Sequence, residues 1–581
     1  MARAHQGDSH TPHNIRLAFI IFAAIGFFLL VRLFFLQVVS GAYYKTQALR
    51  QQNFSGVSAP RRGTIYLRER NGELITLAST KDGYLVFINN KILKDKDAAF
   101  NKLFALISIE ENLFMKAAAK KDDPYEVIFH KVNRETAEKI QELKITGLGV
   151  SPEEWRSYPA KKMAAHATGF VGYDGNELTG RYGLELYYED LLKGEEGFLK
   201  GIPGNWFSKL GKNLLSPPTE GYDIVLTVEP NVQAFVERML ERVETKWHPT
   251  DGGAVIMEPS TGKIIAMAAF PTFDPNSYEK TEELSTFVNP IVENVFEFGS
   301  VFKMLTVASG LNERVITPET TYFDPGKLEL DGYTISNFDG KGRGTVSMQV
   351  VLEQSLNTGA AFVAQKLGKD RMRQYFTNFG LGEKTGITLP GEVAGQIGNL
   401  KTGRDVEIAT AAFGQGVSVT PLEYARAASA LANGGKIMKP YIVERIIRPG
   451  REDSVTKPET IREVIRPETS ETISRMLVQV VDKALLDGEV KSKNFTIAAK
   501  TGTAQIPLKN SKGYSEEYLH SFLGYAPGFD ARFLVFMYIE KPRGVKYASY
   551  SLGPYFKELM HFLLTYYEVP PDRSPSEAAG N

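Results

Sequence analysis

The chain has 581 residues, of which 43% are hydrophobic and 23% are charged, with 68 basic and 68 acidic side chains and no cysteine. This length favours two or more domains of ordinary globular composition. The balanced charge provides no global basic field for nucleic acid. The lack of cysteine excludes disulfides, thiolate metal sites and a cysteine nucleophile.

The eight histidines are scattered along the chain, with no HExxH pattern and no paired spacing. An isolated histidine is usually a surface or core residue, whereas a zinc site needs several ligands brought together. We therefore predict no metal site.

An apolar segment covers residues 17–39 and is interrupted by Arg32 and Gln37. Its length is close to the roughly 20 residues that cross a bilayer. This favours a retained transmembrane helix, preceded by a cytoplasmic tail of residues 1–16, over a cleaved signal peptide. Basic residues are equally frequent on both flanks, so charge alone does not orient the helix.

Residues 43–218 are predicted to form one domain, followed by a Ser-, Pro- and Gly-containing linker at residues 216–221. Short strands are expected at residues 63–65 and 84–88, and charged helices at residues 110–120 and 134–144. A glycine-dense stretch over residues 169–185 completes it. Nothing here has catalytic spacing, so we interpret this domain as a structural or docking module.

Residues 222–568 are predicted to form a second domain with an α+β fold, followed by a disordered tail of residues 569–581. The expected strands are residues 223–227, 253–258, 263–269, 495–500, 520–526 and 533–540, and the expected helices include 231–246 and 554–567. Because helices lie between the early and late strands, we expect a sheet assembled from both ends of the domain.

The short motifs of serine–lysine acyl enzymes, S-x-x-K, S-x-N and K-T-G, each occur more than once. They begin at Ser260, Ser277, Ser300 and Ser454 for the first, at Ser355 and Ser492 for the second, and at Lys384, Lys401 and Lys500 for the third. Each motif alone is weak, so its physical context has to select among the copies.

Ser300 is the one S-x-x-K serine that opens an apolar helix, predicted over residues 301–308. Residues three apart are neighbours on a helix, so Lys303 is expected beside Ser300. Burial disfavours the ammonium form of Lys303 and makes it a better base. The other three serines fall in a turn or in polar stretches.

Lys500 ends a strand-like run and continues as Thr501, Gly502 and Thr503, whereas the other two K-T-G lysines lie in loops. Gly502 has no side chain, so we expect that a substrate backbone can lie against this strand as an added strand.

Ser355 and Asn357 fall between helical stretches, whereas the second S-x-N copy lies too close to Lys500 to form a separate wall. Taken in order, Ser300, Ser355 and Lys500 form one set that is far more specific than any of its pieces.

With this set the chain resembles a class B penicillin-binding protein, from the apolar segment to about Asp572. Further family-like stretches are Arg61–Ile65 with Arg70–Gly72, Gly414–Gly416 with Val419–Pro421, and Leu523–Pro527. Residues 379–392 are closer to the septal FtsI type than to the elongation type. Residues 550–554 depart from the family, because the paired glycines expected after the last strand are missing, which puts the acceptor-side pocket in question.

The resemblance implies a single transmembrane helix, an elongated pedestal domain of the dimerisation type, and a serine β-lactamase-like transpeptidase domain with an antiparallel sheet flanked by helices. It implies a peptidoglycan D,D-transpeptidase, septal in cell division, anchored in the cytoplasmic membrane with its catalytic domain outside the cytoplasm. Neither a cofactor nor a metal is implied.

The resemblance also implies residue roles. Ser300 would attack the penultimate D-Ala carbonyl of a stem peptide, with Lys303 as general base and Ser355 as proton relay. Asn357 would bond the substrate amide and steady Lys303. The remaining roles fall on the third motif: Lys500 and Thr501 would hold the substrate carboxylate, beside Gly502, and the N–H groups of Ser300 and Thr503 would form the oxyanion hole.

The implied partners are D-Ala-D-Ala stem peptides, β-lactams, a membrane-embedded glycan polymerase of the SEDS type (FtsW-like) and other divisome proteins. Three alternatives remain open. One is an elongation-type transpeptidase of the same family. Another is a membrane-tethered D,D-carboxypeptidase or β-lactamase, against which the long pedestal argues. The third is a non-enzymatic β-lactam sensor or divisome scaffold.

Overall fold

The structure, a computed structural model, describes residues 11–34, 60–120, 125–174, 177–194, 219–508 and 513–573. The chain falls into two units, of which the first comprises residues 1–60 with 195–219 and the second residues 61–194 with 220–581. The main described element of the first unit is a helix. The second unit carries both predicted domains and the candidate site.

The predicted apolar helix is observed as α1 (Thr11–Phe34), whereas residues 35–39 of that prediction lie outside the described residues. Large apolar side chains between residues 20 and 34 are exposed, Phe22 to 74%. Within the described ranges, no helix is both long enough and apolar enough to cross a membrane.

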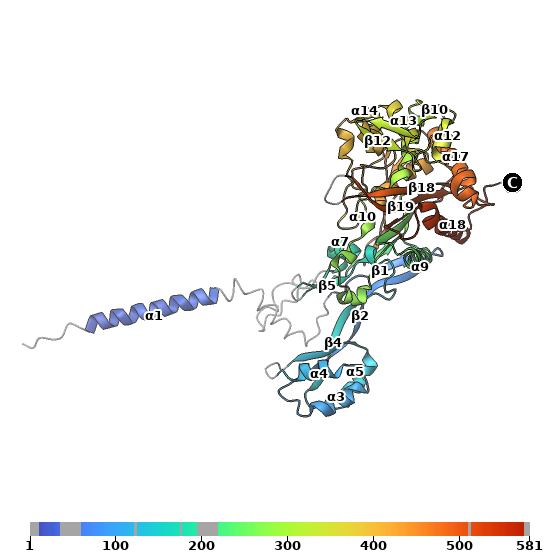
Figure 1. The fold of residues 1–581 in the computed structure, drawn as a ribbon. Coiled ribbons are helices and arrows are strands. Elements are labelled where there is room, and N and C mark those ends of the chain that lie inside the picture. The colour runs from blue at the N-terminus through green and yellow to red at the C-terminus, as the bar shows by residue number, and fades with distance from the viewer. Residues whose placement is uncertain are drawn as a thin grey trace, which may run out of the picture. The chain divides into compact units, whose positions relative to one another are not determined.

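The N-terminal part of the second unit is built on long antiparallel strands that carry three helices at one end (Figure 1). Its elements are β1 (Ile65–Arg68), β2 (Leu74–Ile88), α3 (Lys96–Phe104), α4 (Glu111–Ala118), β3 (Glu126–Val132), α5 (Arg134–Glu142) and β4 (Leu148–Ser157). The helices pack on the strands around a core that includes Val86, Leu103 and Phe114. The two predicted charged helices are therefore confirmed, and the strand predicted at 84–88 is the end of the longer β2.

Strand β7 (Asp223–Leu226) links the pedestal to the following region, because it pairs in parallel with β1 and antiparallel with β15 (Val443–Ile447). The resulting sheet has the order β16-β15-β7-β1-β2-β3, with β4 paired to β2. The two predicted domains thus share one sheet. Residues 216–218 of the predicted linker lie outside the described ranges.

The glycine-dense stretch carries a buried ion cluster. Glu185, fully buried in α7 (Gly183–Tyr187), places its two carboxylate oxygens 2.7 Å from Arg62 Nε and 2.7 Å from Arg156 Nε. Burial would raise the pKa of Glu185, but Arg156 and Arg62 hold it below its ordinary value. The neighbouring elements are α6 (Ala165–Thr168), β5 (Val171–Asp174), β6 (Glu177–Gly180) and α8 (Glu189–Leu192). This stretch therefore joins Arg62 near the start of the pedestal to Arg156 in β4 through one buried carboxylate.

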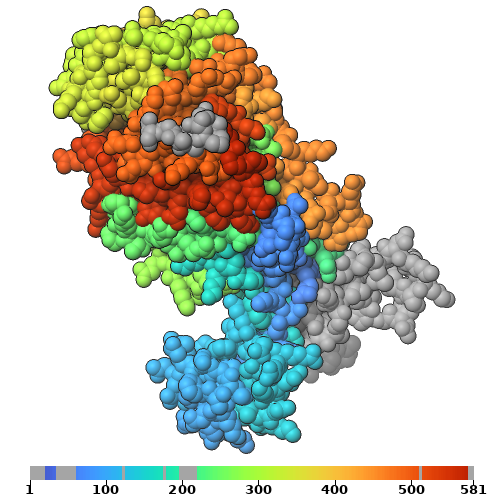
Figure 2. Space-filling model, turned by 90° about the vertical axis from the view of Figure 1, so that its right-hand side faces the viewer, coloured from blue at the N-terminus to red at the C-terminus, as the bar shows by residue number. Residues whose placement is uncertain are grey.

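The C-terminal part of the second unit contains a five-stranded antiparallel sheet in the order β18-β19-β20-β8-β9. The strands are β8 (Asp251–Met257), β9 (Ile264–Phe270), β18 (Ala498–Pro507), β19 (Tyr514–Ala526) and β20 (Phe533–Glu540). Residues of β8 and β20, almost three hundred positions apart in sequence, pair side by side. In Figure 2, green surface from the early part of this region likewise lies against red surface from the end of the chain. The prediction of an α+β fold with a sheet assembled from both ends is confirmed.

The two faces of this sheet are covered by different helices. One face packs with α9 (Pro230–Trp247) and α18 (Ala548–Tyr566), and its core includes Ile256 and Phe522. The other face carries Val255 and Met257 into the core that holds the remaining helices. Those helices are α10 (Pro290–Glu293), α11 (Lys303–Asn312), α12 (Met348–Glu353), α13 (Asn357–Leu367), α14 (Lys369–Asn378), α15 (Asp405–Ala411), α16 (Pro421–Ala432) and α17 (Pro467–Gln479). Alternate residues of each strand therefore serve two separate cores.

Short strands complete the region outside the five-stranded sheet. They are β10 (Thr321–Asp324), β11 (Lys327–Leu330), β12 (Tyr333–Ser336), β13 (Gly344–Ser347), β14 (Lys436–Met438), β16 (Ser454–Val455) and β17 (Thr460–Glu463).

The structure corrects two predictions at the C-terminus. The last helix begins at Ala548, not at Pro554, so the proline lies inside it. The predicted tail is also ordered beyond residue 569, because Asp572 Oδ1 accepts a hydrogen bond from the Thr496 N–H at 2.7 Å and Arg573 pairs with Asp482 at 2.6 Å. Residues 572 and 573 thus bond to the body of the domain, and residues 574–581 lie outside the described residues.

Candidate active site

Ser300 lies in a single 3-10 turn, Gly299–Phe302, that leads directly into α11. The neighbouring side chains Val301, Phe302 and Met304 are fully buried. The predicted apolar helix is therefore present and buried, although its first turn is tighter than an α-helix. This tight turn presents Ser300 at the wall of a cavity while the helix itself is locked in the core.

Lys303 is fully buried and reaches back to the serine, with its Nζ 2.9 Å from Ser300 Oγ. The same Nζ donates to the Ser355 carbonyl at 2.5 Å and lies 3.2 Å from Ser355 Oγ. Burial lowers the pKa of Lys303 well below its ordinary value, and the positive charge of Lys500 lowers it further. The neutral amine is thus favoured beside the hydroxyl that it would deprotonate.

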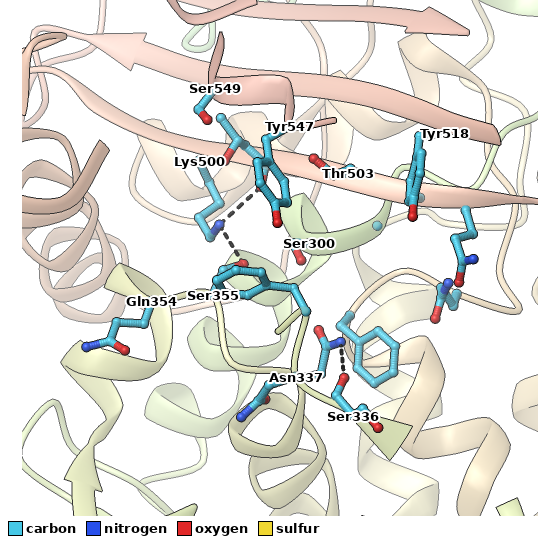
Figure 3. Close-up of a pocket in the computed structure, with 18 of the residues that line it drawn as sticks. Ser300, Ser336, Asn337, Gln354, Ser355, Lys500, Thr503, Tyr518, Tyr547 and Ser549 are labelled. Atoms are coloured by element: carbon cyan, nitrogen blue, oxygen red, sulfur yellow. Dashed lines mark hydrogen bonds between the residues drawn. The ribbon is translucent and has the colours of Figure 1, made fainter. Parts of the chain in front are cut away.

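Lys500 stands on β18 and is 3% exposed. Its Nζ donates to Ser355 Oγ at 2.9 Å and to the Thr501 carbonyl at 3.1 Å, as the dashed lines in Figure 3 mark. Burial lowers the pKa of Lys500 to about 7. The hydroxyl of Ser355 therefore lies between two lysine amines, which is the position a proton relay needs.

Ser355 occupies the turn between α12 and α13 with a φ of 54°, in the left-handed region. Asn357 is the first residue of α13 and lines the same cavity. Its Nδ2 donates to the Ser336 carbonyl at 2.8 Å. Among the described contacts, Lys303 Nζ is bonded to Ser300 and Ser355, so the expected steadying of Lys303 comes from Ser355 and not from Asn357.

A glycine is required at position 502 for a different reason from the predicted approach of a substrate backbone. A Cβ at this position would lie 2.2 Å from the Phe298 carbonyl oxygen and 2.3 Å from Ser521 Oγ, and the residue is buried away from the cavity. The glycine therefore lets β18 approach the turn that carries Ser300. Thr501 and Thr503, on either side, do line the cavity, and Thr503 Oγ1 accepts a hydrogen bond from the Ala548 N–H at 3.1 Å.

These residues surround a cavity of about 1010 Å³. It is lined by Ser300, Ser355, Asn357, Lys500, Thr501 and Thr503 together with aromatic residues from other segments. The rejected motif copies do not line it. Since β18 is an edge strand of its sheet, an extended ligand can add to its free side.

Sequence reasoning missed the aromatic lining of this cavity. Phe338 and Tyr547 contact each other with ring centroids 5.9 Å apart. Both line the cavity, as do Tyr518 and Tyr550. Tyr547 and Tyr550 flank the start of α18, where the sequence departs from the family pattern of paired glycines. The missing glycines are the one sequence signal for this difference, but they do not indicate that tyrosines line the cavity instead.

The arrangement can support acyl transfer. A serine hydroxyl lies beside a buried amine that can accept its proton, and a second hydroxyl connects this amine to another buried lysine. Together with the fold, this defines the class of serine acyl-transfer enzymes that use a lysine in place of histidine.

Comparison with known proteins narrows this class. Residues 252–561 match the family model of the penicillin-binding protein transpeptidase domain, and residues 57–226 match that of the penicillin-binding protein dimerisation domain. The stage V sporulation protein D of Bacillus subtilis is 32% identical over 97% of this chain and 87% of its own length. The chain therefore belongs to the class B penicillin-binding proteins.

Two further similarities agree with this assignment. The peptidoglycan D,D-transpeptidase FtsI of Buchnera aphidicola is 27% identical over 79% of this chain and 78% of its own length. The crystal structure of penicillin-binding protein 2X from Streptococcus thermophilus covers 90% of this chain and 82% of its own chain, with a TM-score of 0.71 and 22% identity. The latter similarity supports the fold.

Proposed function

We propose that the protein is a peptidoglycan D,D-transpeptidase that cross-links stem peptides through an acyl-enzyme on Ser300. The observation that carries the proposal is the contact of Ser300 Oγ with the buried Lys303 amine, joined through Ser355 to Lys500. Family membership and the relative named FtsI support the substrate class.

In acylation, Ser300 Oγ attacks the carbonyl carbon of the penultimate D-Ala and its proton passes to Lys303 Nζ. The C–N bond then breaks, and Ser355 Oγ relays a proton to the leaving D-Ala amine. Lys500 and Thr501 hold the terminal carboxylate. The backbone N–H groups of Ser300 and Thr503 stabilise the oxyanion, a contribution of about 3–4 kcal/mol per donor in comparable sites.

In transfer, the amine of a second stem peptide attacks the acyl carbon and gives up a proton to the neutral Lys303 Nζ. Lys303 returns this proton to Ser300 Oγ as the ester bond breaks. A β-lactam enters the same path with its ring amide in place of the D-Ala-D-Ala bond. Its leaving group stays attached, so the acyl-enzyme persists and the protein binds β-lactams covalently.

The cellular role we propose is septal, in partnership with a SEDS-type polymerase and other divisome proteins. The resemblance of residues 379–392 to the septal type and the relative named FtsI support it. Residues 17–39 serve as the membrane anchor in this proposal, supported by the exposed apolar side chains of α1. A fluorescent fusion is expected at division sites, and a uniform side-wall signal would indicate the elongation type.

The test of the enzymatic proposal is labelling by a fluorescent penicillin. The wild-type chain should be labelled and Ser300→Ala should not. Ser260→Ala, Ser277→Ala and Ser454→Ala are matched controls, because each removes an S-x-x-K serine outside the cavity, and all three should still be labelled. Labelling of Ser300→Ala at the wild-type level would refute the nucleophile, and rapid turnover of the penicillin would identify a hydrolase instead.

A further inference from the structure

A nested pair of hairpins lies beside the loop of residues 354–358, which carries Ser355 and Asn357. In the outer pair β10 aligns with β13, and in the inner pair β11 aligns with β12. The inner hairpin ends at Ser336, the residue whose carbonyl accepts the hydrogen bond from Asn357 Nδ2. The hairpins therefore touch the candidate catalytic loop directly.

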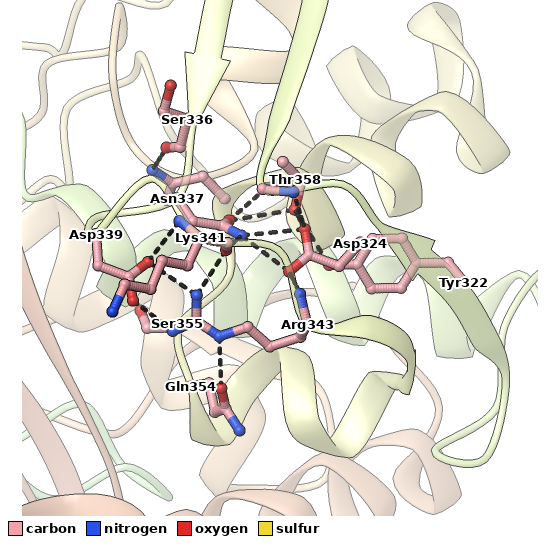
Figure 4. Close-up of polar contacts among 12 residues, drawn as sticks. Tyr322, Asp324, Ser336, Asn337, Asp339, Lys341, Arg343, Gln354, Ser355 and Thr358 are labelled. Atoms are coloured by element: carbon pink, nitrogen blue, oxygen red, sulfur yellow. Dashed lines mark hydrogen bonds and ion pairs between the residues drawn. The ribbon is translucent and has the colours of Figure 1, made fainter.

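Asp324, at the base of these hairpins, is a carboxylate with 1% exposure. Its Oδ1 accepts hydrogen bonds from the Gly326 N–H at 2.9 Å, Thr358 Oγ1 at 2.7 Å and Asn337 Nδ2 at 3.0 Å. Its Oδ2 accepts from Asn337 Nδ2 at 2.9 Å and from the Arg343 N–H at 3.0 Å (Figure 4). In the described part of the chain, no cationic side chain is bonded to it.

A buried carboxylate without a cationic partner is costly unless several donors satisfy it. Two of the donors to Asp324 are next to the two residues of the Asn357–Ser336 hydrogen bond. Thr358 directly follows Asn357, and Asn337 directly follows Ser336. Asn337 Oδ1 in turn accepts the Thr358 N–H at 3.3 Å. Asp324 thus fixes the residues next to both partners of the Asn357–Ser336 hydrogen bond.

The other end of the loop is held from the same hairpins. Arg343 Nε donates to Gln354 Oε1 at 2.9 Å, while its Nη1 pairs with Asp339 at 2.8 Å. Gln354 directly precedes Ser355, whose left-handed backbone is uncommon for a residue other than glycine and persists only where the surroundings hold it. The loop is therefore clamped on both sides of Ser355.

We propose that Asp324 is a positioning residue for the reaction: it holds the S-x-N loop so that Ser355 stays between Lys303 and Lys500. The inference rests on the proposed role of Ser355 as proton relay. A relay at 2.9 and 3.2 Å from two amines loses its function when the loop moves by about an ångström, and misplacement of that size can cost about 100-fold in rate.

The test is the second-order rate of acylation of the full chain by a fluorescent penicillin, measured together with the final fraction of chains labelled. In Asp324→Asn the amide nitrogen meets N–H donors on either side, so contacts break while size is kept. We expect the rate to fall about 100-fold. The final labelled fraction should stay at the wild-type level, because misplacement slows acylation without removing the nucleophile.

Thr358→Val provides a second, milder variant, because it removes one donor to Asp324 and keeps the side-chain shape. Its rate should fall about 10-fold, the size expected for one hydrogen bond to a charged group. Thr469→Val is the matched control, since Thr469 is equally buried and its hydroxyl bonds to Asn312, outside the cavity. It should acylate at the wild-type rate.

Two results would overturn the inference. One is an unchanged rate in both Asp324→Asn and Thr358→Val. The other is a reduced labelled fraction with an unchanged rate, which means that the network only stabilises the fold. Failure of the proposed function gives different results: the wild-type chain is not labelled, Ser300→Ala is still labelled, or the penicillin is turned over rapidly.

Discussion

Two clusters of buried charged side chains, one in the pedestal and one at the cavity, are arranged in opposite ways. In the pedestal, Glu185 lies between Arg62 and Arg156, so each buried charge has a partner of opposite sign. In the cavity, Lys303 and Lys500 are both buried, and their described partners are hydroxyls and carbonyls. The pedestal cluster pairs each charge with one of opposite sign, whereas the cavity brings two lysine amines together without an acidic partner among the described residues.

The difference is visible in the direction of the pKa shifts. Burial would lower the pKa of Arg62, but Glu185 and Glu189 raise it above its ordinary value. Burial lowers the pKa of Lys303, and Lys500 pushes it in the same direction. The shifts in the first cluster therefore favour the ionised forms of its groups. The shifts in the second cluster favour neutral amines, the form that a general base needs.

The largest loss of acylation rate should come from a variant that keeps a permanent positive charge at position 303. Lys303→Arg keeps a cation but cannot readily release its proton. Acylation by a fluorescent penicillin should fall about 10²- to 10⁴-fold, the contribution of a general base. Lys401→Arg, in a K-T-G copy outside the cavity, is the control and should leave the rate unchanged. A near wild-type rate in Lys303→Arg would mean that another group activates Ser300.

The pedestal cluster should give a loss of stability instead. Glu185→Gln leaves two buried guanidinium groups without their shared anion, which should lower the free energy of unfolding by about 3–5 kcal/mol. Denaturant unfolding measures this loss, and the acylation rate per folded chain should be unchanged. Glu138→Gln removes an exposed helix pair with Arg134 and should have little effect. If Glu185→Gln is as stable as wild type, the cluster does not hold the pedestal together.

The close approach of β18 to the nucleophile turn can be tested through Gly502→Ala. The added Cβ meets the Phe298 carbonyl, so the turn that carries Ser300 has to move, and acylation should fall about 100-fold. Gly398→Ala is the control, because a Cβ there meets nothing within 4 Å. An unchanged rate in Gly502→Ala would show that the turn adapts without cost to the reaction.

The lysine pair should also carry a cost in stability. The pKa of Lys500 falls from 10.5 to about 7 on folding, so between these values the unfolded chain holds a proton that the folded chain lacks. Stability is then lost as pH falls from 10.5 toward 7 and stays level below it. Lys500→Met should be inactive yet more stable by about 1–4 kcal/mol at pH 7. This gain should shrink as pH rises, and a gain that is independent of pH would contradict the account.

Much of the site could be predicted because its signals are local. Ser300 and Lys303 are one helical turn apart, and the apolar residues around them already indicate burial. The physical context of Ser300, Ser355 and Lys500 selects, among several copies, those that the structure brings together at one cavity. The five-stranded sheet follows from alternating and apolar runs at both ends of the domain.

The rest depends on contacts between distant residues, for which one sequence carries no signal. Gly502 is needed because Phe298, two hundred positions earlier, lies against it. Glu185 bonds to Arg62, which lies 123 residues earlier in the sequence. The start of the last helix was misplaced for a different reason. Proline is favoured at the first helical position, so the sequence predicts a start at Pro554, whereas the helix begins at Ala548.

The most direct test of the comparison is the pH dependence of penicillin acylation by the wild-type chain. If Lys303 acts as a neutral amine, the rate rises with pH through its lowered pKa and levels off, with a midpoint well below the ordinary value of 10.5. A midpoint near 10.5 would mean that Lys303 behaves as an ordinary solvated lysine, and it would contradict the central claim that the buried, uncompensated lysine pair prepares Ser300 for attack.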